Sequence, residues 1–298
     1  MNKQADCPGS APLAGILQGL TGVIIFSGSL PATRIAVQQM DPLFLTFFRA
    51  AIAGLLALLL VFRSRDRRAK LNRRDISGLL MVAAGVVIGF PLLSALALQQ
   101  MSASHSIIFL ALLPLMTALC AVLLGAERPA FRFWICALCG STLVGGYSVS
   151  QPGSGSLQGD ALMLAAVAVC GLGYAEGARL SRRLGGLQVI CLALIFCLPL
   201  TLPVSLLTCP LSLTDISISG QLALGYVSLF SMLIGFIFWY QGLATGGIAV
   251  VGQLQLLQPF FGLMLSALLL GETLTLPLLA VTAGVIVCVV LAKRRAPL

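Results

Sequence analysis

The stretch RSRDRRAKLNRRDISGLLMVAAGVVIGFPLLSALAL, residues 63–98, decides the fold of this chain. Seven basic residues lie between Arg63 and Arg74, and no charged residue occurs between Ile76 and Leu98. Because about 20 consecutive apolar residues span the hydrocarbon core of a bilayer as a helix, the second part predicts a transmembrane helix. The first part predicts a cationic loop on the cytoplasmic side, where Lys and Arg accumulate beside membrane spans.

The composition of all 298 residues indicates the same class, since 59% are hydrophobic and only 9% are charged. A soluble domain is about 45–50% apolar and about 25% charged, so soluble enzymes, nucleic-acid binders and disordered regulators are excluded. The net charge of +9 does not indicate a nucleic-acid partner, because many basic residues concentrate in one juxtamembrane loop. The nine cysteines are scattered through apolar stretches, and we interpret them as buried hydrophobic residues rather than disulfide, redox or metal-binding groups.

Ten stretches are long and apolar enough to span the membrane, and short loops rich in Gly, Pro and polar residues separate them. The predicted spans are 14–37, 43–62, 76–98, 104–125, 131–149, 160–180, 187–207, 219–242, 248–270 and 275–292. The sequence therefore predicts an all-α membrane protein with ten transmembrane helices.

The distribution of basic residues predicts the orientation of these helices. With the N-terminus inside, the cytoplasmic segments and their helix ends hold sixteen of the eighteen basic residues, and the outer loops hold none. The other two, Arg34 and Arg49, lie within predicted helices. The positive-inside rule thus predicts that both ends of the chain are cytoplasmic.

The two halves of the chain are related by a shift of 145 residues. The matched pairs are Gly28 with Gly173, Arg34 with Arg179, Leu98 with Leu243, Pro114 with Pro259 and Glu127 with Glu272. Each half, residues 1–150 and 151–298, contains five predicted helices, and because five is odd the second repeat enters the membrane inverted. Inverted repeats give inward-open and outward-open states of similar energy, as alternating access requires.

Four short segments carry a resemblance to a known family. They are FSGSLPATR at 26–34, DPLFLTFFR at 41–49, Pro114 followed by GAE at 125–127, and QP at 258–259 followed by LGETLT at 270–275. With its doubled Pro-x12-Glu spacing and five-plus-five plan, nearly the whole chain resembles the EamA-type branch of the drug/metabolite transporter superfamily. Family members often carry Trp-Gly in the first span, where this chain has Phe26 and Ser27.

The resemblance implies a carrier of the bacterial inner membrane, often an exporter of amino acids, other metabolites or drugs. It also implies a central cavity between the halves, walled mainly by the first, third, fourth, sixth, eighth and ninth helices. The expected partners are a small-molecule substrate and the lipid bilayer, and a homodimer is the assembly considered. No nucleic acid, cofactor or metal ion is expected.

Pro114 and Pro259 are candidate gating kinks near the middle of their predicted helices. Each lacks an N–H group, so the carbonyls of Leu110 and Gln255 lose their helical donors. At bilayer depth a neighbouring helix or a cavity must satisfy such carbonyls. A kink that bends during gating and a static kink that serves packing remain equal alternatives.

Polar and aromatic residues of the eighth and ninth spans are candidate cavity residues. Gln253, Gln255 and Gln258 lie at bilayer depth, where polar side chains contact a ligand or bond to another helix. Trp239 and Tyr240 either stack on a ligand or anchor their helix at the inner membrane interface.

Charged residues inside predicted spans need an explanation at bilayer depth. Arg49 requires a carboxylate, carbonyls or water, and both a substrate carboxylate and a structural partner are open. Arg34 is expected to extend outward toward Asp41. Glu176 has Arg179 one helical turn away, which favours a structural ion pair over a proton-coupling site, and hence transport driven mainly by the substrate's own gradient.

Three pairs of glycines spaced four residues apart predict that helices pack closely. The pairs are Gly15/Gly19, Gly85/Gly89 and Gly173/Gly177. A role in helix sliding is secondary to this packing role.

The remaining motifs narrow the function. The single histidine, His105, is expected in the wet headgroup region at the outer end of the fourth helix rather than in a proton relay. No Walker, His-Glu-x-x-His or Gly-x-Ser-x-Gly motif occurs in the sequence, so an ATP-driven pump or an enzyme is not expected and no catalytic residue is assigned. The leading hypothesis is a secondary carrier. A flippase-like carrier of lipid-linked groups and a non-transporting scaffold or lipid-handling enzyme are the alternatives.

Overall fold

The computed structural model describes residues 10–63, 71–124, 131–150, 156–210, 216–246, 251 and 254–293, and every regular element in these ranges is helical. The α-helices are α1 (Ser10–Ser27), α2 (Ser29–Val37), α3 (Pro42–Arg63), α4 (Arg73–Val82), α5 (Phe90–Gln100), α6 (Ala103–Leu110), α7 (Leu113–Leu123), α8 (Phe131–Ser150), α9 (Leu157–Leu184), α10 (Gly186–Leu207), α11 (Ile218–Tyr226), α12 (Gly235–Gly246), α14 (Gln258–Leu270) and α15 (Leu276–Lys293). Two π-helices, η1 (Ala83–Gly89) and η2 (Val227–Ile234), and one 3-10 helix, η3 (Gln255–Leu257), interrupt them. The predicted all-α class is confirmed for this part of the chain.

Seven helical stretches of the described residues are long and apolar enough to cross a membrane. They are Leu13–Val37, Pro42–Arg63, Arg73–Gln100, Ala103–Leu123, Leu157–Leu184, Gly186–Leu207 and Ile218–Gly246. Shorter apolar helices, Trp134–Val144, Gln255–Leu270 and Leu276–Cys288, lie in the other three predicted spans. The total of ten membrane-spanning helices therefore stays a prediction.

Polar residues of the short loops begin several helices. Asn72 and Asp75 form a capping box at the start of α4, each side chain accepting the other's backbone N–H, at 2.8 and 2.7 Å. Ser102 accepts the N–H of His105 at 3.2 Å and begins α6. Such caps satisfy N–H groups that have no partner within the helix. The predicted break between the third and fourth spans is thus confirmed at Ser102.

The proline-containing spans are interrupted rather than simply bent. Before Pro114 the chain leaves the α-helical pattern at residues 111–112, whose N–H groups bond to carbonyls three residues back at 3.1 and 3.0 Å. Before Pro259, η3 plays the same part. Both prolines then occupy the second residue of a new helix, where their missing N–H has no cost. The predicted mid-helix kinks are therefore helix breaks.

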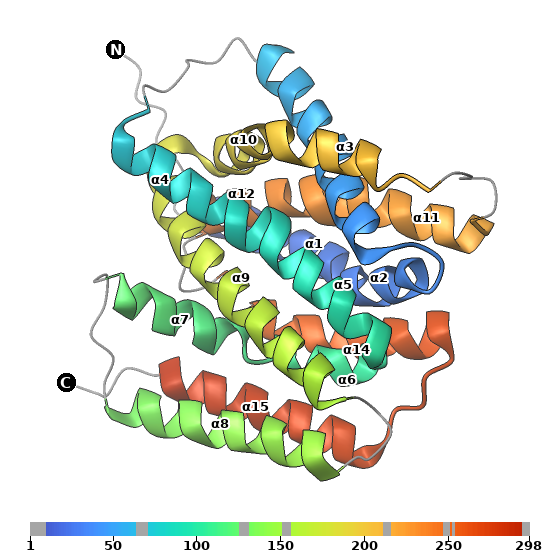
Figure 1. The fold of residues 1–298 in the computed structure, drawn as a ribbon. Helices are drawn as coiled ribbons and strands as arrows, with labels where there is room; N and C mark the ends of the chain where they lie inside the picture. Colours follow the sequence, from blue (N-terminus) through green and yellow to red (C-terminus); the bar gives the residue numbers. More distant parts are fainter. Residues whose placement is uncertain are drawn as a thin grey trace.

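Close helix pairs build the bundle (Figure 1). In chain-distant pairs, α1 packs on α12, α3 on α10, α6 on α14, and α8 on α15, and the long α9 runs against α4, η1, α5 and α7. A Cβ on Gly15 would lie 2.2 Å from the backbone nitrogen of Gly246, and one on Gly85 would lie 2.3 Å from the Val169 carbonyl. The predicted close-packing role of these two glycines is confirmed.

Candidate functional site

A narrow cavity lies among the helices of the bundle. Its open volume is about 30 Å³, which is room for about two waters. The lining residues come from eleven helical elements and are Phe26, Ser29, Leu30, Arg49, Val86, Phe90, Pro91, Leu110, Leu113, Cys170, Tyr174, Ser231, Phe236 and Gln258. The first, third, fourth, sixth, eighth and ninth predicted spans, which were expected to wall a central cavity, all contribute lining residues. The second span, α3, adds Arg49.

Eight of these lining residues form four pairs separated by 145 positions. The pairs are Ser29 with Tyr174, Val86 with Ser231, Pro91 with Phe236, and Leu113 with Gln258. The same shift relates the repeat pairs in the sequence. Tyr174, Ser231 and Phe236 were missed as candidates, and the shift alone could not have found them, because their mates Ser29, Val86 and Pro91 were not candidates either.

Arg49 is the charged group of the cavity wall. Its residue is 5% exposed, and its Nη2 donates to the Ser231 hydroxyl at 3.2 Å. Ser231 in turn shares a 2.7 Å hydrogen bond with the Ser29 hydroxyl. The Nε of Arg49 is buried without a hydrogen-bond partner among the described residues. A guanidinium so placed is incompletely satisfied, which is costly at low dielectric.

Aromatic rings form the wall beside this polar group. The Phe26 and Phe236 centroids are 4.7 Å apart, and Tyr174 lies edge-on to Phe236 at 6.1 Å. Trp239 lies behind them, 6.4 Å from Tyr174 and 6.5 Å from Phe26. Phe26, which stands where the family often has Trp, therefore still supplies a ring to this cluster.

Tyr240 and Trp239 are buried within the bundle rather than exposed at its surface, at 0% and 3% exposure. Neither lines the cavity, but Tyr240 packs against Phe236, with ring centroids 5.6 Å apart. The Tyr240 hydroxyl and the Trp239 Nε1 have no hydrogen-bond partner among the described residues. Both side chains thus support the aromatic wall from behind.

The three candidate glutamines lie in different surroundings. Gln258 lines the cavity at 7% exposure, and its backbone carbonyl accepts the Ser27 hydroxyl at 3.3 Å. Gln255 is buried in η3, outside the lining, and its amide nitrogen is without a partner in the described part of the chain. Gln253 lies outside the described residues.

Both proline breaks adjoin the cavity. Leu110, the last residue of α6, and Leu113, the first of α7, line it on either side of the break before Pro114. In the C-terminal half of the chain, Gln258 lines it immediately before Pro259. A movement at either break would change the cavity wall directly.

Glu176 lies away from the cavity and faces Arg179. The Arg179 Nε donates to the Glu176 Oε2 at 2.8 Å, so the predicted ion pair is confirmed. The same carboxylate faces α4, because a Cβ on Gly78 would lie 3.1 Å from it. Nearby, Arg183 pairs with Asp75, which links the end of α9 to the start of α4. Glu176 is thus placed with structural contacts between helices.

Arg34 does not extend toward Asp41 as expected. Its Nη1 donates to the carbonyl of Leu98, at the end of α5. Asp41 instead accepts the N–H groups of Leu43 and Phe44, at 2.7 and 3.2 Å. The carboxylate is therefore used by the start of α3, and the arginine satisfies a carbonyl of a neighbouring helix.

His105 is buried, which corrects its expected place in wet headgroups. It is 2% exposed, and its Nε2 lies 2.8 Å from the Asp160 Oδ1 on α9. The rings of Phe109 and Tyr147 lie 5.9 and 5.8 Å from the imidazole. The Asp160 carboxylate, in the first turn of α9, is the hydrogen-bonding partner that offsets the loss of hydration of the buried imidazole.

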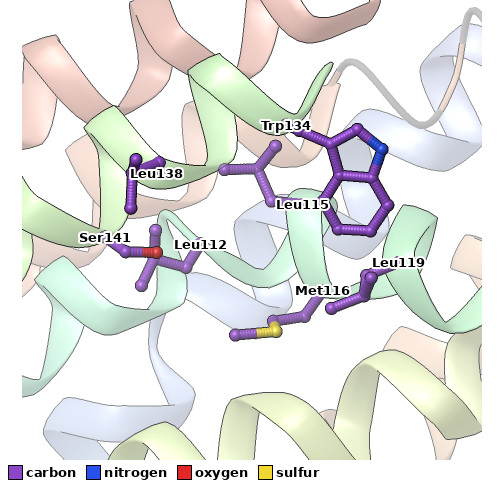
Figure 2. Close-up of a pocket in the computed structure, with 7 residues that line it drawn as sticks. All are labelled: Leu112, Leu115, Met116, Leu119, Trp134, Leu138 and Ser141. Carbon is purple, nitrogen blue, oxygen red and sulfur yellow. The ribbon is translucent and has the colours of Figure 1, made fainter. Parts of the chain in front are cut away.

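A second pocket is a wider groove between α7 and α8 (Figure 2). Its volume is about 230 Å³, and it is lined by Leu112, Leu115, Met116, Leu119, Trp134, Leu138 and Ser141. Six of these seven side chains are apolar or aromatic, so the groove suits hydrocarbon rather than a polar solute.

Comparison with known proteins assigns the family. The model of the EamA-like transporter family matches residues 13–145 and again residues 157–293. The chain is 58% identical over 282 residues to "Uncharacterized transporter YdeK" of Bacillus subtilis (strain 168), an alignment that covers 94% of this chain and 97% of that protein. A solved structure described as "Crystal structure of protein" superposes with a TM-score of 0.65 at 16% identity, covering 94% of this chain and 96% of the other, and so shares the fold. The chain is a transporter of the EamA-like family, within the drug/metabolite transporter superfamily.

Proposed function

We propose that this protein is a secondary carrier of the bacterial inner membrane, built from two inverted five-helix repeats, that exports a small, partly apolar metabolite by alternating access. The observation that carries the proposal is the set of four lining pairs related by the 145-residue shift. A cavity lined by equivalent positions of two repeats is the arrangement in which exchanging their conformations moves the opening from one side to the other.

The irregular points of the helices support the same relation. Shifting η1 (Ala83–Gly89) by 145 residues gives 228–234, which lies within η2 (Val227–Ile234). Shifting the break at 111–112 gives 256–257, which lies within η3 (Gln255–Leu257). π-bulges and broken helices are common at functional sites of membrane proteins. Each proposed repeat thus has its deformable points at corresponding places beside the cavity.

Helix packing agrees with this correspondence. α3 lies on α10 and α8 on α15, and each of these pairs joins equivalent elements of the two proposed repeats. α6, the first part of the fourth predicted span, lies on α14, the second part of the ninth, so this contact also joins corresponding spans. Around a two-fold axis, equivalent elements meet one another in this way. The packing therefore favours two repeats over an irregular bundle.

Polar contacts join the proposed repeats at both ends of α9. At its start, the Ser156 hydroxyl donates to the Gln100 side chain at 2.6 Å. At its end, Arg183 pairs with Asp75. Together with the cavity volume of about 30 Å³, these contacts describe a closed arrangement that must open to admit a solute.

The cavity wall favours a small metabolite with an apolar part. Ten of the fourteen lining residues are apolar or aromatic, and Arg49, Ser29, Ser231 and Gln258 add polar groups. Ligand sites commonly combine an apolar wall with a few placed polar groups. Export as the direction of transport rests on the family resemblance alone.

The groove between α7 and α8 favours one second candidate, a carrier of lipid-linked groups, because its apolar wall suits an acyl chain. A fluorescent phospholipid in proteoliposomes tests this candidate, since a lipid carrier exposes inner-leaflet lipid to an external quencher. Protection of the inner-leaflet lipid, with uptake of a soluble metabolite, supports the solute carrier.

Two experiments test the main proposal. Reporter fusions after Arg74, Arg183 and Arg295 are expected to report the cytoplasm, and fusions near Gly155 and Thr214 the outside. A cytoplasmic signal at Gly155 would contradict the inverted repeats. Uptake of a panel of labelled metabolites into proteoliposomes tests transport itself, and a panel without any protein-dependent uptake would contradict the carrier.

A further inference from the structure

We propose that Arg49 is the anion-binding group of the central cavity and that the substrates are organic monocarboxylates with an apolar or aromatic body. This inference rests on the proposed function, because it takes the cavity between the repeats as the place where the transported solute binds. It adds the chemical class of that solute and the residue that selects it.

The first argument is that no acidic residue in the described ranges pairs with Arg49. The chain has nine acidic residues, and the five in the described ranges are engaged at a helix start or with a basic residue other than Arg49. They are Asp41 (start of α3), Asp75 (start of α4, and Arg183), Asp160 (His105), Glu176 (Arg179) and Glu272 (start of α6). The remaining four lie outside the described residues. A buried cation without an anion is strongly unfavourable, so a ligand with a negative charge supplies the counter-charge that the described residues do not.

The second argument is the geometry of the guanidinium. The Nε has no partner among the described residues, and Nη2 bonds only to a hydroxyl, that of Ser231. A carboxylate binds an arginine through two parallel N–H groups, such as Nε and Nη2, and these charge-assisted bonds are stronger than a bond to a neutral hydroxyl. The Ser231 and Ser29 hydroxyls share a 2.7 Å hydrogen bond that uses one of their two protons, so one hydroxyl remains as a donor for the same oxygens.

The third argument is the asymmetry of the cavity wall. The 145-residue shift relates Arg49 to Leu194, so the second repeat supplies no matching charge. Of the residues that the structure describes, those that line the cavity include one cation and no acidic side chain. Phe26, Tyr174 and Phe236 supply an aromatic surface for the body of the ligand. A ligand with one carboxylate and an apolar group can bind both Arg49 and the aromatic surface. An organic cation would instead be repelled by Arg49.

The experiment compares three ligands that share a body and differ in the head group. Radiolabelled 3-phenylpropionate, 3-phenylpropanamide and 3-phenylpropylammonium are each equilibrated with the purified full-length protein in nanodiscs. The parent is expected to bind the carboxylate most tightly. Hydrogen bonds between charged groups are stronger than those between neutral groups. Arg49→Gln is therefore expected to weaken carboxylate binding by roughly 10- to 100-fold while leaving amide binding unchanged. Arg34→Gln is the matched control, since Arg34 bonds to the Leu98 carbonyl outside the lining, and it is expected to keep carboxylate binding.

Thermal unfolding of the ligand-free proteins separates this role from a structural one. Removal of an unpaired buried charge is expected to leave the unfolding midpoint of Arg49→Gln equal to or above that of the parent, whereas a structural arginine predicts a lower midpoint. If Arg49→Gln does not fold, Arg49→Lys keeps the charge and is expected to retain the preference for the carboxylate. Equal binding of carboxylate and amide by the parent, or the same preference in Arg49→Gln, overturns the inference.

Uptake by proteoliposomes distinguishes this inference from the proposed function. Uptake of the amide or the amine that is the same in the parent and in Arg49→Gln supports the carrier and overturns the anion site. Carboxylate binding that depends on Arg49, with no solute moved in any direction, supports the anion site and overturns the carrier.

Discussion

Replacement of Glu272 by Gln is expected to loosen closure of the cavity at its predicted outer end. Glu272 lies between α14 and α15, and its two carboxylate oxygens accept the N–H groups of Ala103 and Ser104, at 2.9 and 2.7 Å, at the start of α6. The contact joins the two proposed repeats. A carboxylate at a helix N-terminus makes charge-assisted hydrogen bonds and also interacts with the helix dipole. The change to Gln removes the charge and one acceptor but keeps the other.

The size of the effect follows from these contacts. Glu272 is half-buried, so the charge is partly screened by solvent. One lost charge-assisted bond and the lost dipole interaction together amount to about 1–2 kcal/mol. If the closed state is weakened by that amount, the outward-open population rises by roughly 5- to 30-fold.

Labelling of Cys170 measures this opening. Cys170 lines the cavity and is 2% exposed. In a variant that keeps only this cysteine, a membrane-impermeant maleimide is added outside right-side-out vesicles, and Glu272→Gln is expected to raise the labelling rate by roughly 5- to 30-fold, in proportion to the open population. Thr273→Ala, at an exposed position of the same loop, is the control. A folded Glu272→Gln protein that labels at the parent rate would refute the reasoning.

Three further predictions follow from named contacts. Pro114→Ala and Pro259→Ala are expected to fold and to slow transport by comparable factors, since both breaks adjoin the cavity; parent-rate uptake by both variants would make the breaks static packing features. His105→Ala removes the imidazole whose Nε2 lies 2.8 Å from the Asp160 Oδ1 and is expected to destabilise the protein by about 1–3 kcal/mol. The double variant with Asp160→Ala is expected to lose less stability than the sum of the two single losses. Additive losses in thermal unfolding would show that the two side chains do not stabilise each other. Glu176→Gln is expected to leave substrate flux equally insensitive to an imposed pH gradient, because Glu176 is paired with Arg179 away from the cavity; a pH-gradient response that disappears in this variant would instead make Glu176 the proton carrier.

The helical class and the main apolar helices could be predicted from the sequence because membrane insertion depends on local composition. The uncharged stretch from Ile76 to Leu98 needs no partner to indicate a span, and it lies within Arg73–Gln100 in the structure. The breaks beside Pro114 and Pro259 were also accessible, since a missing N–H is a property of one residue. Whether a new helix or a bend forms there depends on the neighbouring carbonyls, so this form could not be predicted from the sequence.

The partners of polar side chains could not be predicted in the same way. Arg34 bonds to the Leu98 carbonyl and His105 to Asp160, because the rotation and depth of each helix are set by packing against distant segments. Likewise, Gln255 and Gln258 are one turn apart, yet only Gln258 lines the cavity. The shift of 145 residues is the sequence signal that relates eight of the fourteen lining residues in pairs.

Distances at the two ends of the bundle test the central claim, alternating access, most directly. Spin labels at Gln99 and Leu157 report the predicted outer end, and labels at Arg74 and Arg182 report the predicted inner end; all four positions are exposed. In nanodiscs, Glu272→Gln is expected to lengthen the outer distance in part of the population while the inner distance stays short. Simultaneous lengthening of both distances in the same molecules, measured with all four labels present, would indicate a continuous pore and contradict the account.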